Sequence, residues 1–258
     1  MSIHDQEPFE ARFEWGAEGA RVLGAASRTV VIVDLLSFST AVEVAVSRGA
    51  IVYPRRWRAG VSREIAGRAG AVATVRRSAT SMSHPFSLSP RSMMNARRGM
   101  RLIVASPNGA HAALAAARSG ATVLAGCLRN ATACAKAAMK IGKPIAVIAA
   151  GEQWSPGAGL RPGFEDLVGA GAILTAMRKL SMSPEATAAV AAFRSASGDL
   201  LGALSRCSSG RELIARGFRS DVVWASRVDV SVVVPIMRDR VFERFAPERS
   251  AAESSGSA

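Results

Sequence analysis

Three apolar runs in this chain each end in a polar turn that leads into a helix-like stretch. The runs are VVIVDLLSFST from Val30, RLIVASPNGAH from Arg101 and IAVIAAGEQW from Ile145. Continuous apolar runs are typical of buried parallel strands, and ligands bind in the crevice beyond the carboxyl ends of such strands. We therefore predict that the three turns converge on one site.

Strand-like and helix-like segments alternate along most of the chain. Apolar, β-rich runs predict strands at 29–36, 51–54, 101–105, 122–127 and 144–150, with one or two closing strands within 221–237. Helical spacing predicts helices at 38–48, 109–121, 130–143, 164–180, 184–206 and 209–217, with Phe164 facing inward. This alternation is typical of an α/β fold whose largely parallel or mixed sheet is covered on both faces.

The alternating pattern fills residues 29–245, which we expect to form the main domain after an N-terminal segment, 1–28. The stretch 57–100 is the least regular and the richest in Arg and Ser. It is compatible with a lid or with a connection between two subdomains, and periodicity does not decide between them. Residues 246–258 are small, polar and aperiodic, so we expect a disordered tail there and little structure in roughly the first ten residues.

Composition indicates a soluble globular protein. The chain has 258 residues, 49% of them hydrophobic, and a mean hydropathy of +0.18, so it can bury a large core. No apolar stretch approaches the ~20 residues that span a bilayer, and residues 1–20 lack the pattern of a signal peptide. Cys127, Cys134 and Cys207 form no C-x-x-C pair and are odd in number, which indicates reduced core thiols in a cytoplasmic protein.

The net charge of +13 and the pI near 11.2 raise the question of a nucleic-acid partner. The arginines occur as short groups between apolar segments, and aromatic residues are only 5% of the chain, too few for an evident base-stacking platform. Nucleic acid is therefore not favoured. A solvated basic surface and the attraction of a small, highly charged anion both stay open.

Several phosphate chemistries are disfavoured by spacing. Pro144 follows Gly142-Lys143 where a Walker loop needs Ser or Thr, and GAGLRPG lacks dinucleotide-binding spacing. Leu36 stands where an aspartyl-phosphate phosphatase of the haloacid type carries its second aspartate, two residues after Asp34. The cysteines lack an arginine six residues later, and no histidine has the basic neighbours of a histidine phosphatase.

Carboxylates and amides at the polar turns remain as candidates. They are the groups expected where a hard divalent ion activates water and neutralises a phosphoryl group. Asp34 ends the first run, Asn108-Gly109 precedes a helix whose N–H groups can bind phosphate, and Glu165 and Asp166 open another helix. Each has a simpler alternative as a cap, a turn or a partner of the helix dipole. Further candidate donors are Ser39, Thr40 and Asn130.

At these residues the chain resembles the 2-phosphosulfolactate phosphatase (ComB) family. The resemblance covers roughly residues 29–240 and rests on VVIVDLLSFSTAVEVAVSRGA, FSLSP, SPNGA, AGCLRNATA, GFEDLVGAGAI and GRELIARGFRSDV. It implies a three-layer α/β/α fold and the Mg²⁺-dependent hydrolysis of (2R)-2-phospho-3-sulfolactate to 3-sulfolactate and phosphate, a step of coenzyme M biosynthesis. The matching motif positions are Asp34, Asn108, Gly109, Asn130, Glu165 and Asp166.

The chain departs from this family pattern at three places. Leu88-Ser89-Pro90 stands where the pattern has Asn-Ser-Pro, and Ser89 is a further candidate for substrate binding. Ser37 stands where the pattern commonly has an arginine, and the Gly-Glu expected before the irregular stretch is absent near 75–77. We hypothesise that Arg161 and Glu152, in the loop before Glu165, substitute for the missing groups. The alternative is a catalytically inactive relative that binds an anionic ligand or nucleic acid.

The expected mechanism places Mg²⁺ on Asp34 together with Glu165 or Asp166. Asn108 and the Gly109 amide would hold phosphoryl oxygens of a small anionic phosphorylated substrate, and the remaining carboxylate would serve the departing alkoxide. A covalent attack by Asp34 stays open, as does assembly into a homo-oligomer.

Overall fold

The computed structural model describes residues 3–56, 70–155 and 158–246 and has the predicted α/β architecture. Its main sheet has nine strands in the order β1-β7-β2-β6-β10-β11-β3-β5-β4. The strands are β1 (Ala11–Trp15), β7 (Ile145–Ala149), β2 (Thr29–Val33), β6 (Thr122–Ala125), β10 (Pro235–Arg238), β11 (Val241–Arg244), β3 (Ile51–Arg56), β5 (Arg101–Ser106) and β4 (Val72–Ala73). A separate hairpin pairs β8 (Glu152–Gln153) with β9 (Leu160–Arg161).

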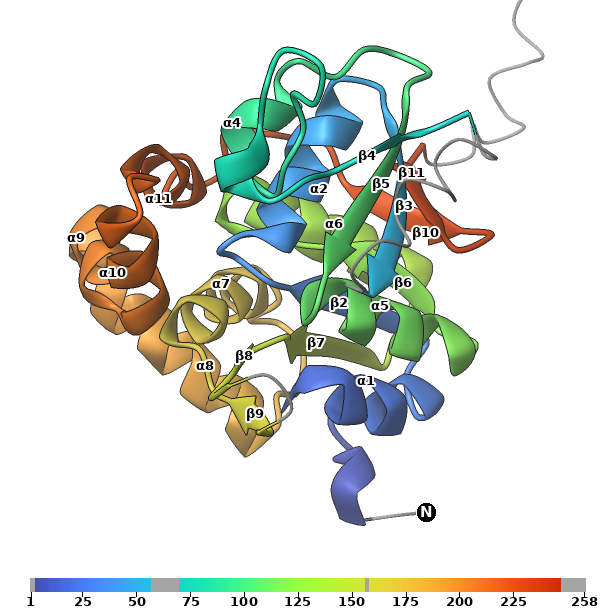
Figure 1. Ribbon diagram of the computed structural model, residues 1–258. Helices are drawn as coiled ribbons and strands as arrows, with labels where there is room; N and C mark the ends of the chain where they lie inside the picture. Colours follow the sequence, from blue (N-terminus) through green and yellow to red (C-terminus); the bar gives the residue numbers. More distant parts are fainter. Residues whose placement is uncertain (1–2, 57–69, 156–157, 247–258) are drawn as a thin grey trace, which may run out of the picture.

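Helices cover both faces of the sheet, which gives the three layers (Figure 1). One face packs against α1 (Gly16–Ala25), α2 (Phe38–Ser47) and α5 (Gly109–Arg118). The other packs against α6 (Ala131–Ile141), α7 (Phe164–Thr175) and α8 (Pro184–Ala196). Shorter helices are α4 (Pro90–Met93), α9 (Leu200–Arg206), α10 (Ser208–Ala215), α11 (Arg219–Ala225) and single turns at η1 (Ile3–Asp5), η2 (Arg77–Ala79), η3 (Leu128–Asn130) and η4 (Ser197–Asp199).

Strand β2 shows why the central strands of this sheet are continuous apolar runs in the sequence. All five of its residues are buried, with Val30 and Ile32 in the core on one face and Val31 and Val33 in the core on the other. Successive side chains of a strand point to opposite faces, so a strand covered on both sides has no polar face to alternate with.

The sheet combines two groups of parallel strands. β1, β7, β2 and β6 form one group, and β3, β5 and β4 form the other. The β10–β11 hairpin joins them through three successive antiparallel pairings, so the two groups run in opposite senses. The β6–β10 and β11–β3 pairings are short, with one residue pair in register each. Figure 1 shows the result for one strand of each group, because the arrows of β5 and β7 point in different directions.

Three local predictions are wrong. Residues 219–225 form helix α11 instead of part of a closing strand, because Val222 and Ala225 are buried three residues apart, on one side of a helix. The helix predicted over 184–206 breaks at 197–199, and Asp199 caps the following helix by accepting a bond from the Gly202 amide. Phe164 is 42% exposed, since it occupies the first position of α7.

The segments outside the predicted main domain have different outcomes. Residues 11–25 add strand β1 beside β7 and helix α1 beside α5. The tail predicted over 246–258 lies outside the described residues from 247 onward, and part of the irregular stretch, 57–69, does too. Within the described ranges, none of the helices has the length and apolar character required to cross a bilayer.

The three thiols are free, as predicted. Cys127 and Cys134 are buried in the core, whereas Cys207 is only partly buried. Cys207 lies between α9 and α10, which gather with α11 at one side of the molecule in Figure 1.

Candidate functional site

Asp34 lies in the turn between β2 and α2, and the turn is folded around its carboxylate. Oδ1 accepts the Phe38 amide at 3.1 Å, and Oδ2 accepts the Gly109 amide at 2.8 Å and the Ser106 hydroxyl at 3.2 Å. Asp34 is 7% exposed. The first and second predicted turns, which are more than 70 residues apart in sequence, therefore meet at one carboxylate.

Gly109 is required at this contact because of its size. A Cβ atom at position 109 would lie 2.5 Å from Asp34 Oδ2 and 2.5 Å from a ring carbon of Phe38. Only a residue without a side chain lets the start of α5 approach Asp34 closely enough for the amide to donate.

Asp166 ties the first turn to the third. Its Oδ1 accepts the Leu35 amide at 2.7 Å and its Oδ2 accepts the Gly151 amide at 2.8 Å, just beyond the ends of the neighbouring strands β2 and β7. Both oxygens of this buried carboxyl thus hold backbone donors. Asp166 acts as a brace that fixes the spacing of the two turns.

Glu165 and Glu152 complete a group of four acidic side chains. Glu165 is 2% exposed, and its Oε2 accepts a weak bond from the Cys207 thiol at 3.4 Å. Glu152 Oε2 accepts the Asn108 side-chain amide at 2.8 Å, which links the second turn to the third. The predicted convergence of the three turns is therefore present in the structure.

Burial and mutual repulsion raise the pKa values of Asp34, Asp166 and Glu152. Burial, opposed by three hydrogen bonds and reinforced by the Glu165 charge, raises the pKa of Asp34. Burial and the charges of Asp34 and Glu165 raise the pKa of Asp166 well above its usual value. Burial, then Asp34 and Glu165, raise the pKa of Glu152 to about 7, although Asn108 and Arg161 act in the opposite direction.

A cavity of about 230 Å³ opens beside Asp34. It is smaller than the ~300 to 1,000 Å³ of sites for drug-sized ligands and suits a small metabolite. Acidic, polar and basic side chains share its walls. Its charged and amide-bearing lining residues are Asp34, Glu152, Glu212, Asn108, Arg77 and Arg216.

Sequence reasoning missed Arg77, whose guanidinium lies against Ser37. Nη2 donates to Ser37 Oγ at 2.7 Å, and Nε pairs with Asp221 Oδ2 at 2.9 Å. Ser89 also donates to Asp221, at 2.6 Å. An arginine thus reaches position 37 from the irregular stretch, although residue 37 itself is a serine.

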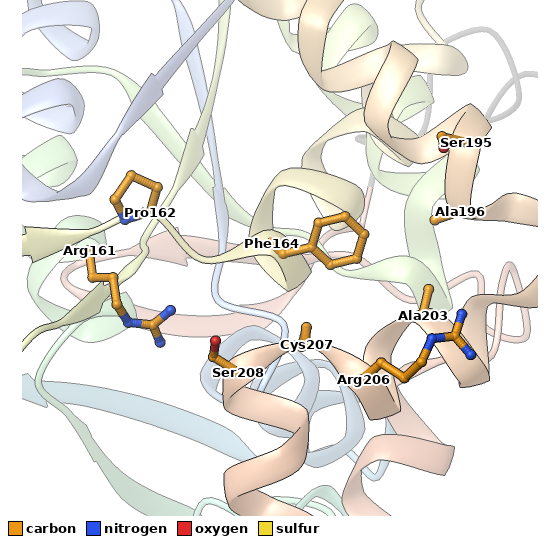
Figure 2. A pocket seen from close by; sticks show the side chains of 9 residues that line it. All are labelled: Arg161, Pro162, Phe164, Ser195, Ala196, Ala203, Arg206, Cys207 and Ser208. Atoms are coloured by element: carbon orange, nitrogen blue, oxygen red, sulfur yellow. The ribbon is translucent and has the colours of Figure 1, made fainter.

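The hypothesised pair Glu152 and Arg161 lies on the β8–β9 hairpin, where the two residues are directly opposite each other. Glu152 lines the cavity beside Asp34, whereas Arg161 donates to Ser209 Oγ at 3.2 Å and lies 6.0 Å from the centre of the Trp154 ring. Arg161 lines a second cavity of about 520 Å³, shown in Figure 2, with Phe164 and Cys207 between Arg161 and Arg206.

Four other predicted donors bond to protein groups in the structure. The hydroxyl of Ser39 donates to the Asp34 carbonyl at 2.9 Å, and that of Thr40 donates to the Leu35 carbonyl at 2.8 Å. Asn130 accepts the Cys127 amide at 2.9 Å and donates to the Val233 carbonyl at 3.0 Å. The Gly109 amide donates to Asp34. These groups shape the turns that carry the acidic side chains.

The four acidic side chains supply the oxygen atoms that a hard divalent ion takes as ligands. Mg²⁺ prefers oxygen ligands and is usually held by one or two carboxylates, with water and substrate phosphate completing the shell. Among the described residues, no three or more His, Cys, Asp or Glu side chains are arranged to chelate a metal. Asp34 fits an ion of this kind better than Asp166 because Asp34 lines the cavity and Asp166 does not, although both carboxyl groups accept backbone amides on both oxygens. Glu165 is the second candidate, since it is buried and its charge acts on Asp34.

Comparison with known proteins gives a consistent result. A sequence model of the family described as 2-phosphosulpholactate phosphatase matches residues 20–240. A protein of Thermus thermophilus named "Probable 2-phosphosulfolactate phosphatase" is 35% identical over 166 residues, which cover 63% of this chain and 68% of that protein. Because the family match includes most of the chain and all three turns, this protein belongs to the 2-phosphosulfolactate phosphatase family.

Proposed function

We propose that this protein is a cytoplasmic, Mg²⁺-dependent phosphatase that hydrolyses (2R)-2-phospho-3-sulfolactate, or a related small phosphorylated organic acid, to 3-sulfolactate and phosphate. The observation that carries this proposal is the cavity beside Asp34, whose walls combine the buried Asp34 and the half-buried Glu152 with arginines. Carboxylates suit a cation and arginines suit acidic groups, so one small cavity can hold both an ion and a multiply charged substrate.

Asp34 and Glu165 would hold the ion, which supplies charge neutralisation at the phosphoryl group when bound. The Gly109 amide and the Ser106 hydroxyl fix the Asp34 carboxylate by hydrogen bonds at 2.8 and 3.2 Å. A fixed carboxylate needs no reorganisation during the reaction, which is the property required of an electrostatic or nucleophilic group. The geometry is compatible with Asp34 in either role.

Glu152 is the proposed proton donor to the departing alkoxide. With a pKa of about 7, its carboxyl group is partly protonated near neutral pH, as general acid catalysis requires. Asn108 orients it through the 2.8 Å bond to Oε2, and in this assignment Oε1 would carry the proton. In this assignment Asn108 positions the acid instead of holding phosphate directly.

The test is phosphate release from 2-phosphosulfolactate by the full chain, in Mg²⁺ and in EDTA. We expect turnover in Mg²⁺, none in EDTA, and a loss of at least about 100-fold in Asp34→Asn, in line with the removal of a charge-stabilising group. Asp229→Asn is the matched control, because Asp229 is exposed, bonds to Thr132 at the start of α6 and is not among the residues that line the cavity beside Asp34. If no phosphomonoester is cleaved and DNA is retained in a salt-sensitive manner, the chain is a binding protein instead.

A further inference from the structure

Arg77 lines the cavity and comes from a segment that contains none of the four acidic residues. It belongs to η2, in the described part of the irregular stretch, and its side chain is 13% exposed. Leu88, Phe218 and Asp221 surround it, with the guanidinium carbon 5.6 Å from the centre of the Phe218 ring. Together with Ser37, these residues come from three segments of the chain, which hold this one cation at the wall of the cavity.

Hydrogen bonds from two of its three nitrogens orient the guanidinium of Arg77. Nε bonds to Asp221, and Nη2 bonds to Ser37 and to the Leu88 carbonyl, at 2.9, 2.7 and 3.3 Å. Among the described residues Nη1 has no hydrogen-bond partner, and it is not one of the buried side-chain atoms left unsatisfied. An arginine carries five N–H donors, so the cavity side of this fork keeps donors for a ligand.

Asp221 holds the arginine in place. It is 1% exposed, and its other oxygen accepts the Ser89 hydroxyl at 2.6 Å. A buried carboxylate with both oxygens bonded is a rigid support, and it fixes the guanidinium plane before any ligand arrives.

We propose that Arg77 determines substrate specificity by binding the acidic group of the substrate that is not transferred, a carboxylate or sulfonate, with Asp221 and Ser89 as positioning residues. The inference rests on the proposed function, because that function puts the phosphoryl group at the carboxylates around Asp34. Arg77 is bonded to Ser37 and Asp221 and not to these carboxylates, so it is placed to bind another part of the substrate. The Nη1 group can donate charge-assisted hydrogen bonds to the oxygens of a carboxylate or sulfonate.

The first measurement is the affinity for 3-sulfolactate, which has both acidic groups and no phosphate, by titration calorimetry in Mg²⁺. Arg77→Gln is expected to weaken binding by about 10- to 100-fold, the usual effect of losing a charge-assisted hydrogen bond. Arg21→Gln is the matched control, since Arg21 pairs with Glu18 on the exposed surface of α1. It should bind 3-sulfolactate as the unchanged protein does.

The second measurement is the ratio of kcat/KM for 2-phosphosulfolactate to that for isopropyl phosphate, which has no second acidic group. A ratio measured on one preparation does not depend on the fraction of folded enzyme, so it remains informative if a variant is less stable. Arg77→Gln should lower this ratio by about tenfold or more. Asp221→Asn should lower it in the same direction, and the double variant should lose little beyond Arg77→Gln alone.

The two proposals fail in different ways. The specificity role is overturned if Arg77→Gln binds 3-sulfolactate as tightly as the unchanged protein does, or if its kcat/KM falls equally for both substrates. In either case, phosphate release by the unchanged protein would still support the proposed function. If the unchanged protein cleaves no substrate but binds 3-sulfolactate through Arg77, the phosphatase proposal fails and the binding role stands.

Discussion

The buried acidic group should make the metal-free protein less stable as pH rises. Glu152 has a usual pKa of 4.5 and a pKa of about 7 in the folded protein, so the folded state binds this proton more tightly than the unfolded chain does. A group of this kind stabilises the fold fully below its unfolded pKa, and the contribution is lost as pH rises through the folded pKa. The loss should therefore extend from about pH 4.5 to about pH 7.

The size of the effect follows from the pKa difference. At about 1.4 kcal/mol per pH unit, the rise of the Glu152 pKa from 4.5 to about 7 corresponds to at most about 3 to 4 kcal/mol. A chain of this length shifts its melting midpoint by ~2 to 4 °C per kcal/mol, so Glu152 alone accounts for up to ~7 to 14 °C. Burial raises the pKa values of Asp34 and Asp166 too, and both act in the same direction.

The assay is thermal unfolding in EDTA at several pH values between 4.5 and 8, for the unchanged protein and for Glu152→Gln. The variant keeps an oxygen acceptor for Asn108 but cannot titrate, so its midpoint should fall less steeply with pH. Mg²⁺ should raise the midpoint of the unchanged protein more at pH 8 than at pH 5, because the carboxylates are ionised there. If the difference between the two proteins is constant from pH 4.5 to 8, the electrostatic reasoning is refuted.

Three further perturbations probe the packing around the site. Gly109→Ala should reduce activity by about 100-fold or more, since its Cβ would meet Asp34 Oδ2 at 2.5 Å, whereas Gly198→Ala, with open space around it, should leave kcat/KM unchanged. Glu43→Gln should lower the free energy of unfolding by about 3 to 5 kcal/mol in urea titrations, because the buried charge of Arg129, bonded to Glu43 at 2.6 Å, would lose the negative charge that compensates it. Equal urea midpoints for Glu43→Gln and the unchanged protein would contradict this. Burial and Glu165 raise the pKa of Cys207 to about 12, so its thiol should resist alkylation by iodoacetamide at pH 8 in the folded protein. Mass spectrometry measures the rate of alkylation. Rapid alkylation would contradict the described environment of the thiol.

The sequence was sufficient to predict the layers of the fold and the meeting of the three turns. Runs such as residues 29–33 are apolar because both faces of the strand are buried, and this signal is local and strong. The meeting of the first and third turns follows from the parallel pairing of β2 with β7. The second turn reaches Asp34 although β5 belongs to the strand group that runs in the opposite sense. The prediction relied on parallel strands whose carboxyl ends share one edge of the sheet, and that reason does not cover the second turn.

The assignment of donors was less successful, because a side chain's partners depend on contacts that spacing does not encode. Asn108 and Gly109 are at the expected place, but their N–H groups face Glu152 and Asp34 instead of an open phosphate site. Asp166 looked equivalent to Glu165 in the sequence, and only the positions of the Leu35 and Gly151 amides separate a brace from a candidate ligand. Helix α11 was missed since DVVW has the β-branched composition of a strand, and tertiary packing overrides that preference.

Arg77 shows why a charged residue in an irregular segment is the hardest kind of site residue to predict. Its partner Asp221 is 144 residues away and lies on the helix that sequence reasoning assigned to a strand, so the error about α11 also hid the support for the arginine. In a strand, Asp221 and Val222 would point to opposite faces, whereas the helix lets Asp221 reach Arg77 while Val222 and Ala225 remain in the core. The position of this cation in the cavity therefore depends on the helical period of residues 219–225, which is a property of packing and not of the residues near Arg77.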